Sequence, residues 1–346
     1  MPSIKKVAEV AGVSVGTVSH VITGSVPVSE ELRLKVQAAI RDLNYHPNHV
    51  ARSLKTSRTR TLGIIVPDMT ISFFPQVIRG AETAARERGY FLIAVNSDDD
   101  AERQKDLLSL LRSQRVEGIL LVVAAAPTPM MQISRILDAG IPIVCLDRIP
   151  DRVAVDSVSV EDVEAAEMGV NHLLEMGARR IAVATGPLTL KNERRRLQGY
   201  RQAIERAGIP VEEQLIWQGN LRPSDVMALC RENLAAAPRP EAIFSTNGPT
   251  ALGVLQALRS LSLATPRDIA FATFDELAVA DIFSPSITSI VQPAYEIGSR
   301  AANLLLDRIE RVEGLNETVT LRLSANLKVG ESSGWNGSGG RAPQAR

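Results

Sequence analysis

Polar residues close several short apolar segments of this 346-residue sequence, namely Asp68, Asn96, Asp147, Asn247 and Asp275. Carboxylate and amide groups exchange hydrogen bonds with adjacent hydroxyl groups, and the guanidinium of Arg196, in the run KNERRR, could hold two oxygens at once. The neighbouring Arg194 and Arg195 are expected on a solvated helix face.

No catalytic signature accompanies these residues. The sequence contains no HExxH, GxxxxGK[ST] or GxGxxG motif. His172 is the one histidine after residue 60, and it sits in the helical pattern VNHLLEMG, where a structural role is expected. A sugar-converting enzyme would need Asp147 or Asp275 as a base with a pKa raised toward neutrality. We therefore expect a binding protein that is not an enzyme and carries no cofactor.

The segments that precede the polar residues predict parallel β-sheets. From Leu62 onward, β-rich runs such as LGIIVPD, IPIVCLD and IAFATFD alternate with helical stretches, which is typical of βαβ units. Ligands of open α/β sheets bind beyond the carboxyl ends of the strands, so the polar strand endings are expected at a binding site. The segment from Glu331, ESSGWNGSGGRAPQAR, is rich in Gly and Ser and is expected to be disordered.

The sequence before the first β-rich run has helical periodicity instead. Apolar residues within 4–11 share one face of a helix that Ser3 caps and Gly12 ends. A second run capped by Ser14 and a third capped by Ser29 complete a three-helix bundle. The first two helices predict a helix-turn-helix. Its second helix would present to the major groove of DNA the residues Val15, Gly16, Thr17, Ser19 and His20.

The charge distribution favours a polyanionic partner for this N-terminal segment. The whole chain balances 39 Lys and Arg against 39 Asp and Glu, whereas residues 1–60 hold nine basic and four acidic residues. The segment therefore has a surplus of five positive charges and the remainder a surplus of five negative charges. A basic module on an acidic body favours nucleic acid as the partner, although a solvated basic face would have the same composition.

The remaining compositional signals point to an intracellular chain. The start, MPSIKKVAEV, has no long apolar region, and no run of about 18 apolar residues occurs, so we expect a cytoplasmic protein without a membrane partner. Cys145 and Cys230 are not arranged as CxxC. We expect both to be buried free thiols, with no metal site.

Several longer motifs occur in order along the chain: VAEVAGVSVGTVSHVI at 7–22, LNYHPN at 43–48, VARSL at 50–54, RRLQGY at 195–200, FDEL at 274–277 and PSITSIVQPAYEIG at 285–298. In these motifs, within a match from about Ser3 to Gly330, the sequence resembles the lactose-repressor (LacI/GalR) family of bacterial transcription regulators. The resemblance implies a homodimer. It also implies an N-terminal all-α helix-turn-helix domain and an α/β body with parallel sheets, two-lobed like a periplasmic sugar-binding protein.

The resemblance places the boundaries of these parts. The helix-turn-helix domain would occupy residues 1–46 and a hinge segment 47–61, whose helix at about 48–56 orders when paired across a dimer on DNA. The effector-binding and dimerisation body would occupy 62–330, followed by a disordered tail at 331–346. Within the body, the expected lobes are an N-terminal lobe at about 62–161 and 290–322 and a C-terminal lobe at about 162–289 and 323–330.

The resemblance also assigns the DNA contacts. Leu54, with Ala51 beside it, would be wedged into the central minor groove of a pseudo-palindromic operator. The full set of expected DNA contacts is Ile4, Lys5, Ser14, Val15, Gly16, Thr17, Ser19, His20, Thr23, Ser29, Tyr45, Asn48, Ala51 and Leu54. Val15, Gly16 and His20 replace the longer or arginine side chains of other members, so the operator sequence cannot be transferred from a relative.

The effector would bind between the lobes. The resemblance implies contacts from Asp147, Arg196, Asn247, Asp275 and Gln292, with Phe73 and Phe74 as an apolar wall. Gly248, the pair Glu161-Asp162 and Leu221 depart from residues that are usual in the family. We expect a small sugar or sugar derivative that releases a repressor from its operator. The alternative is a corepressor-dependent regulator that senses a nucleobase or an organic acid.

Replacing Leu54 with alanine should weaken binding to the specific operator far more than binding to non-specific DNA. An apolar wedge contributes only where the central base step is kinked. Titration of the full chain with operator and with random duplex, at one salt concentration, measures both affinities. Equal losses on the two duplexes would mean that the hinge is only a tether.

Overall fold

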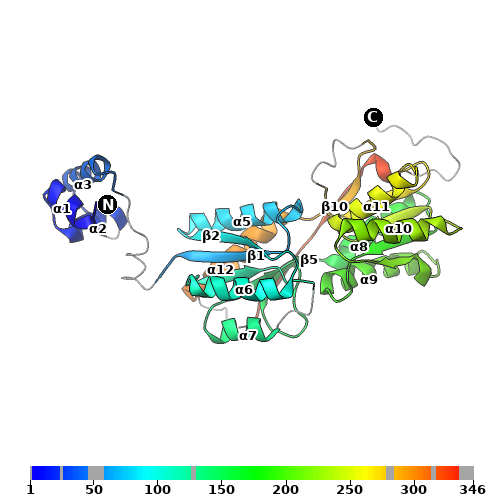
Figure 1. Ribbon diagram of the computed structural model, residues 1–346, viewed down its shortest axis with the longest axis horizontal. Helices are drawn as coiled ribbons and strands as arrows, with labels where there is room; N and C mark the ends of the chain where they lie inside the picture. Colours follow the sequence, from blue (N-terminus) through cyan, green and yellow to red (C-terminus); the bar gives the residue numbers. More distant parts are fainter. Residues whose placement is uncertain are drawn as a thin grey trace. The chain divides into compact units, whose positions relative to one another are not determined.

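The computed structural model describes residues 2–23, 26–45, 58–125, 130–277, 284–312 and 317–334. The chain divides into two compact units, Met1–Thr59 and Arg60–Arg346. The first is helical in its described part, and the second is an α/β body built on two separate sheets (Figure 1).

The described part of the N-terminal unit consists of α1 (Ile4–Ala11), α2 (Val15–Thr23) and α3 (Glu30–Asp42). The Ser3 side chain accepts a hydrogen bond from a first-turn amide of α1 at 3.3 Å, and Gly12 ends that helix with a left-handed φ of 66°. Ser14 caps α2 through a backbone hydrogen bond of 3.1 Å. These three caps confirm the sequence-based prediction. Ser29 precedes α3, but its side chain makes no capping hydrogen bond.

The three helices enclose a small apolar core that contains Val7, Ala8, Val18, Val36, Ala39 and Tyr45. The side chain of Tyr45, which we expected at a DNA-backbone contact, is 9% exposed and packs in this core, and its contact with DNA stays a prediction. A unit of this size has little apolar surface to bury, so a large aromatic ring just after α3 contributes strongly to its stability. The structure therefore gives the ring of Tyr45 a packing role.

The body contains two six-stranded sheets. The first has the strand order β11-β5-β4-β3-β1-β2, with β1 (Thr61–Val66), β2 (Phe91–Asn96), β3 (Gly118–Leu121), β4 (Ile143–Leu146), β5 (Asp156–Val160) and β11 (Thr320–Leu323). The second has the order β12-β10-β9-β8-β6-β7, with β6 (Ile181–Thr185), β7 (Ile216–Gln218), β8 (Ala242–Ser245), β9 (Ala270–Phe274), β10 (Thr288–Val291) and β12 (Asn326–Lys328). Only β10 and β12 pair antiparallel among the described strands, which confirms the predicted parallel sheets.

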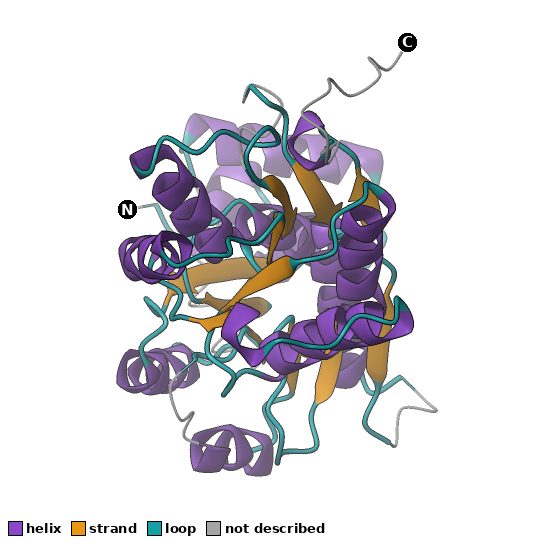
Figure 2. Ribbon diagram, turned by 90° about the vertical axis from the view of Figure 1, so that its right-hand side faces the viewer, coloured by secondary structure: helices purple, strands orange, loops and turns teal. Residues whose placement is uncertain are grey.

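Helices cover both faces of each sheet (Figures 1 and 2). The first sheet lies between the pair α5 (Phe73–Glu87) and α12 (Ala294–Glu310) and the pair α6 (Ala101–Ser113) and α7 (Met130–Asp138). The second lies between the pair α8 (Asp162–Glu175) and α9 (Lys191–Arg206) and the pair α10 (Pro223–Ala235) and α11 (Gly248–Ser260). Because successive strand residues point to opposite faces, Ile181 and Val183 join one core cluster and Ala182 and Ala184 the other. Among the described helices, none has the length and apolar character needed to span a membrane.

Glycines set the contact between α5 and α12. A Cβ atom at Gly80 would lie 2.0 Å from the carbonyl oxygen of Tyr295, and one at Gly298 would lie 1.9 Å from that of Val77. Any larger residue would push the two helices apart. The close contact fixes α5, and with it Phe73 at the start of that helix.

The chain passes between the two lobes three times: after β5, between β10 and α12, and between β11 and β12. The boundaries of the last two passages differ slightly from those expected at residues 290 and 322. Strand β10 keeps the chain in the second sheet through Val291, and β11 keeps it in the first sheet through Leu323.

The described C-terminal end corrects the expected disorder from Glu331. A short 3-10 helix, η3 (Glu331–Ser333), carries two buried serines. The Ser332 hydroxyl donates to a β9 carbonyl at 2.7 Å and accepts from the Thr288 amide at 2.8 Å, while the Ser333 hydroxyl lies 2.7 Å from His172 Nε2. Polar composition favours disorder only when the polar groups lack partners inside the fold. Here they have partners, and His172 has the structural role that we expected.

Both cysteines are free and buried, as the sequence predicted. Burial raises the pKa of Cys145 to about 12 and that of Cys230 likewise to about 12. Neither thiol is therefore a nucleophile near neutral pH.

Replacing Ser332 with alanine should lower the free energy of unfolding by about 1–3 kcal/mol, because the buried Thr288 amide would lose its acceptor. Urea-induced unfolding measures the change. Ser109→Ala is the matched control, since the Ser109 hydroxyl bonds to a carbonyl of its own helix at an exposed site, and it should cost less than about 0.5 kcal/mol. Similar losses in both variants would contradict a specific role for Ser332.

Candidate functional site

Four of the predicted effector-binding residues follow strands of the two sheets. Asp147 follows β4, Asn247 lies just beyond β8, Asp275 follows β9 and Gln292 follows β10. Asp147 and Asp275 have left-handed φ angles of 55° and 74°, a conformation that disfavours residues other than glycine. Such strained positions occur where a side chain is held in a functional site.

Three of these strand endings, Asp147, Asn247 and Asp275, meet at one cavity between the lobes, and Gln292 does not line it. The cavity has about 350 Å³ of empty volume, including the space open to solvent. The predicted residues that line it are Phe73, Phe74, Asp147, Arg196, Asn247 and Asp275. Gln292 is buried and donates a hydrogen bond of 2.5 Å to Asp275 Oδ1. The first three lining residues belong to the first lobe and the last three to the second, so a ligand in the cavity would contact both lobes.

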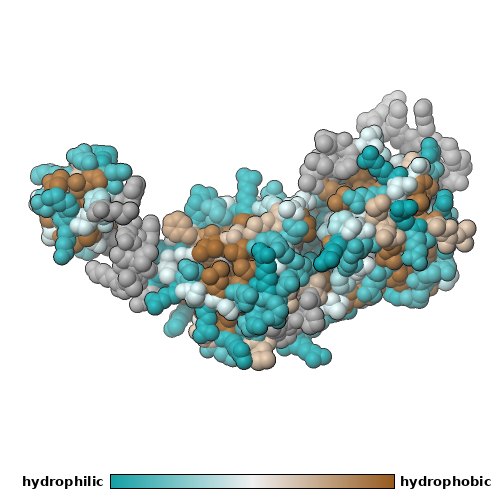
Figure 3. All heavy atoms as spheres, viewed as in Figure 1, coloured by the Kyte–Doolittle hydropathy of each residue, from teal (hydrophilic) through white to brown (hydrophobic). Residues whose placement is uncertain are grey.

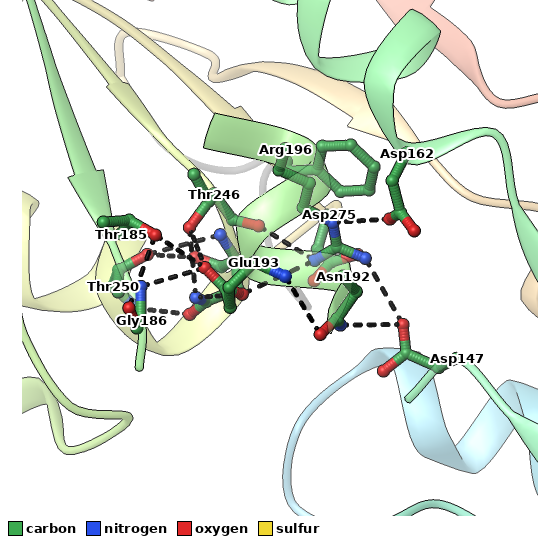
Figure 4. A network of polar contacts seen from close by, with 12 residues as sticks. Asp147, Asp162, Thr185, Gly186, Asn192, Glu193, Arg196, Thr246, Thr250 and Asp275 are labelled. Atoms are coloured by element: carbon green, nitrogen blue, oxygen red, sulfur yellow. Dashed lines mark hydrogen bonds and ion pairs between the residues drawn. The ribbon is translucent and has the colours of Figure 1, made fainter. Parts of the chain in front are cut away.

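Arg196 is the centre of a buried polar network beside the cavity (Figure 4). Its side chain is 2% exposed, and its Nε donates to Asp162 at 2.9 Å. Nη1 donates to the Thr246 carbonyl at 2.9 Å, and Nη2 to Asp147 at 3.3 Å. The guanidinium carbon lies 3.8 Å from the centroid of the Phe274 ring, a cation–π contact. One cation therefore connects α9, the start of α8 and the end of β4.

Glu193 is a site residue that its sequence context conceals. It is buried, and its carboxylate accepts from the Thr185 hydroxyl at 3.0 Å, the Gly186 amide at 2.9 Å and the Asn247 side-chain amide at 3.0 Å. These bonds orient Asn247 toward the cavity. In the sequence Glu193 stands in a charged run, and its position one helical turn before Arg196 is the one signal that could have identified it.

Further unpredicted residues also line the cavity: Ile71, Arg148, Asn192 and Pro249, together with Leu221. Arg148 is buried and forms an ion pair of 2.6 Å with Asp99. The Asn192 amide donates to Asp147 at 3.4 Å. Both therefore hold neighbouring groups in place at the cavity wall.

Two polar strand endings do not reach the cavity. Asp68, after β1, accepts a hydrogen bond from the Thr70 amide at 2.8 Å, and Asn96, at the end of β2, accepts one from the Met69 amide at 3.0 Å. Both shape the loop that leads to α5. The strand-end pattern alone does not separate these loop residues from ligand-facing ones.

The predicted DNA contacts in the described part of the first unit are mostly accessible. The exposed ones are Lys5, Ser14, Val15, Gly16 and Ser29, and the partly exposed ones are Ile4, Thr17, Ser19 and His20. Val15 is 41% exposed at the start of α2, and an apolar side chain there suits contact with a thymine methyl group. The Thr23 side chain, Asn48, Ala51 and Leu54 lie outside the described residues.

Comparison with known proteins explains the combination of the two units. The family profile "Bacterial regulatory proteins, lacI family" matches residues 3–48, and "Periplasmic binding protein-like domain" matches residues 170–333. The ribose operon repressor of Escherichia coli (strain K12) is 36% identical over 309 residues, which cover 89% of this chain and 93% of that protein. The chain belongs to the lacI family.

Solved structures of similar proteins have the same fold. A transcriptional regulator CelR–cellobiose complex is 32% identical, with a TM-score of 0.72 over 96% of this chain and 100% of that one. The Lac repressor dimer bound to operator and the anti-inducer ONPF, at 24% identity, shows the fold alone, with a TM-score of 0.82 over 96% and 99% of the two chains. The predicted fold class is confirmed. As a lacI-family member, the protein is a ligand-responsive, DNA-binding regulator of transcription.

The crowded carboxylates shift proton equilibria at the site of this lacI-family protein. Burial raises the pKa of Asp162 to about 7, with Arg196 opposing the shift. Burial likewise raises the pKa of Asp275, again against the effect of Arg196. Burial lowers the pKa of Arg196, but Asp162, Asp147 and Asp275 outweigh it, so the pKa is raised overall and the guanidinium stays charged. One cation cannot neutralise all of its acidic neighbours, and protonating one of them relieves the imbalance.

Asp162 should make the unfolding free energy fall as the pH rises from about 4 to about 7. In this range the folded carboxyl binds its proton more tightly than the unfolded one, so deprotonation favours unfolding. Asp162→Asn should lack this contribution, and urea unfolding at a series of pH values measures both proteins.

The difference between the two curves of unfolding free energy against pH gives the contribution of Asp162. Burial lowers the pKa of His172, which produces an opposite trend near pH 6 in both proteins and cancels in the difference. Parallel curves would mean that Asp162 stays ionised beside Arg196.

Proposed function

We propose that this protein is a homodimeric repressor that leaves a pseudo-palindromic operator when a small, uncharged, hydroxyl-rich effector binds the cavity between its lobes. The proposal extends the family assignment in three ways: the sign of the response, the chemistry of the effector and the oligomeric state.

The surplus of hydrogen-bond acceptors at the cavity carries the proposal about the effector. The guanidinium of Arg196 is engaged with protein partners, and Arg148 is paired with a carboxylate of the first lobe. The carboxyl groups of Asp147 and Asp275 line the cavity, and the buried Oε1 of Gln292 has no hydrogen-bond partner among the described residues. Such a site binds a ligand that donates hydrogen bonds, as sugar hydroxyl groups do, and repels carboxylates and phosphates.

The apolar part of the cavity supports the same class of ligand. Phe73 and Phe74 stand edge to face, with ring centroids 5.2 Å apart, and Ile71, Leu221 and Pro249 extend the apolar wall. A sugar presents a carbon–hydrogen face together with an edge of hydroxyl groups, and the cavity offers partners for both. Ribose and cellobiose appear in the names of the similar repressor and regulator complex, which adds support.

A corepressor of the nucleobase class is the second candidate. The ring of Phe73 could stack on a flat heterocycle, and amide groups such as that of Asn247 could pair with its edge. An organic acid fits less well, because its carboxylate would face Asp147 and Asp275. Thermal-shift measurements with sugars, nucleobases and organic acids separate these classes of effector.

We assign the edge strand β2 as the interface with the second copy of the chain in the dimer. It ends the first sheet, and its Phe91 and Ile93 are 61% and 37% exposed. Figure 3 shows apolar groups gathered on this part of the first lobe. An exposed apolar edge strand favours association, and an operator with two half-sites requires two recognition helices.

We assign no enzymatic activity to the protein. The sequence GVSVG at 12–16 has the GxSxG spacing of hydrolase nucleophiles, but it joins two helices and not a strand and a helix, and its serine caps α2. A regulator that binds bacterial DNA acts in the cytoplasm, where we place this one.

Closure of the two lobes would transmit the effector signal. A ligand that contacts Phe73 and Asp147 on one side and Asn247 and Asp275 on the other stabilises one relative arrangement of the lobes. Couplings between allosteric sites are typically about 1–3 kcal/mol, which corresponds to a change of about 5- to 150-fold in DNA affinity. The hinge segment joins the sequence directly before β1, and its order on DNA would depend on that arrangement.

A thermal-shift panel of pentoses, hexoses, disaccharides, sugar acids, organic acids and nucleobases tests the effector class. A neutral sugar at about 100 times its Kd should stabilise the protein by about 2.7 kcal/mol. The same sugar should release operator DNA in a binding assay. Asp275→Ala should abolish the shift, since it removes a buried acceptor at the cavity.

Asp106→Ala, at an exposed site on α6, is the matched control and should keep the full shift. Stabilisation by acids or nucleobases alone, or operator binding that the sugar strengthens, would reject the inducer proposal. The family assignment and the DNA-binding function would stand in either case.

A further inference from the structure

We propose that the protein has a second ligand site, for a small oxyanion such as inorganic phosphate, in a separate pocket between the lobes. The pocket has about 430 Å³ of empty volume, including the space open to solvent. Strands β5 and β11 form its first-lobe wall, and the beginning of α9 forms its second-lobe wall. The donors that line it are the cationic side chains of Lys191, Arg195 and Arg322 and the hydroxyl groups of Ser157, Ser159 and Thr320.

The positive side chains of this pocket are only loosely neutralised. Glu161 lies 3.5 Å from Arg195 and 3.8 Å from Arg322, long distances for charge-assisted hydrogen bonds, and it is shared between the two. Lys191 forms no ion pair with any residue that the structure describes. Arg194, by contrast, has an ion pair of 2.6 Å. Arg195, which we expected on a solvated face, is 25% exposed because it lines the pocket.

Uncharged donors at the pocket also favour an anion. Helix α9 begins at Lys191, and the side chain of its N-cap residue, Leu190, cannot accept hydrogen bonds. The Glu193 amide bonds instead to the Asn192 side chain at 3.1 Å, and the amides of Lys191 and Asn192 are the donors that this helix start offers to an anion. Ser159 is 4% exposed and lines the pocket, yet its hydroxyl has no hydrogen-bond partner among the described residues. Its oxygen is not among the fully buried unpartnered atoms, so it is open to the pocket, where it can donate a hydrogen bond to a ligand or a water molecule. A phosphate oxygen would accept this hydrogen bond.

The carboxylates at the pocket do not make it a cation site. Asp147 and Asp162 line it, but both accept hydrogen bonds from Arg196, and Asp147 accepts another from Asn192 (Figure 4). The three cationic side chains that line the pocket, those of Lys191, Arg195 and Arg322, outnumber these two carboxylates. A metal ion would meet those cations, whereas an oxyanion would meet donors without close acceptors.

The site is distinct in chemistry from the effector cavity, although Asp147 and Asn192 line both. The effector cavity offers acceptors to a neutral polyol, and this pocket offers donors to an anion. The inference therefore does not depend on which sugar, if any, is the effector.

Calorimetric titration of the full chain with inorganic phosphate, at constant ionic strength with chloride replaced, tests the proposal. We expect saturable binding of one phosphate per chain. Lys191→Gln and Arg322→Gln should each raise the Kd about tenfold or more, because each removes a charged donor. Ser159→Ala, which changes no charge, should raise it about threefold or more. Arg300→Gln, at an exposed ion pair on α12, removes an equal charge and should leave the Kd unchanged.

Two results would overturn the site. The first is that phosphate shows no saturable binding beyond the binding of chloride. The other is phosphate binding that all three pocket variants leave unchanged, which would place the anion on the basic DNA-binding unit. The outcome of the sugar panel is independent of both, so failure of the effector proposal would be recognised separately.

Discussion

The buried guanidinium of Arg196 is the interaction on which the site depends. A charge removed from water is unfavourable by several kcal/mol unless it is paired and fully hydrogen-bonded, and here its partners are Asp162, Asp147 and the Thr246 carbonyl. Two of these belong to the second lobe and one to the first. The same hydrogen bonds that stabilise the cation therefore position α9 against the end of β4. The two lobes therefore share one electrostatic element beside the cavity.

The sheet edge that lines the cavity was predictable because parallel strands bring their carboxyl ends together. Asp147, Asn247 and Asp275 come from segments far apart in the sequence, and the structure places all three at one cavity. Asp68 and Asn96 obey the same pattern but stabilise a loop. The pattern gives the edge of the sheet and leaves the direction of each side chain undetermined. That direction depends on backbone angles, such as the left-handed φ of Asp147 and Asp275, which composition does not encode.

The residues that were not predicted are polar groups whose burial depends on distant partners. Glu193 stands in a charged helical run, where solvent exposure is the usual state. It is buried here because the side-chain amide of Asn247 and donors at the end of β6 form hydrogen bonds with it. Ser332 and Ser333 lie in a segment whose composition favours disorder, and they are ordered by Thr288 and His172. Sequence patterns describe the average environment of a residue type. They do not reveal a specific partner that reaches the residue from another part of the chain.

The late position of β11, β12 and η3 in the chain has a consequence for synthesis on the ribosome. The first unit makes its core from residues before 60, whereas both sheets are completed by residues 320–334. Roughly 275 residues separate the two, which at about 5–20 residues per second takes roughly 15–55 s. During that interval a nascent chain has its DNA-reading unit but neither the sensor nor the completed sheet to which β2 belongs. With β2 as the proposed contact between copies, such a chain would remain a monomer and would occupy only half of a two-fold operator.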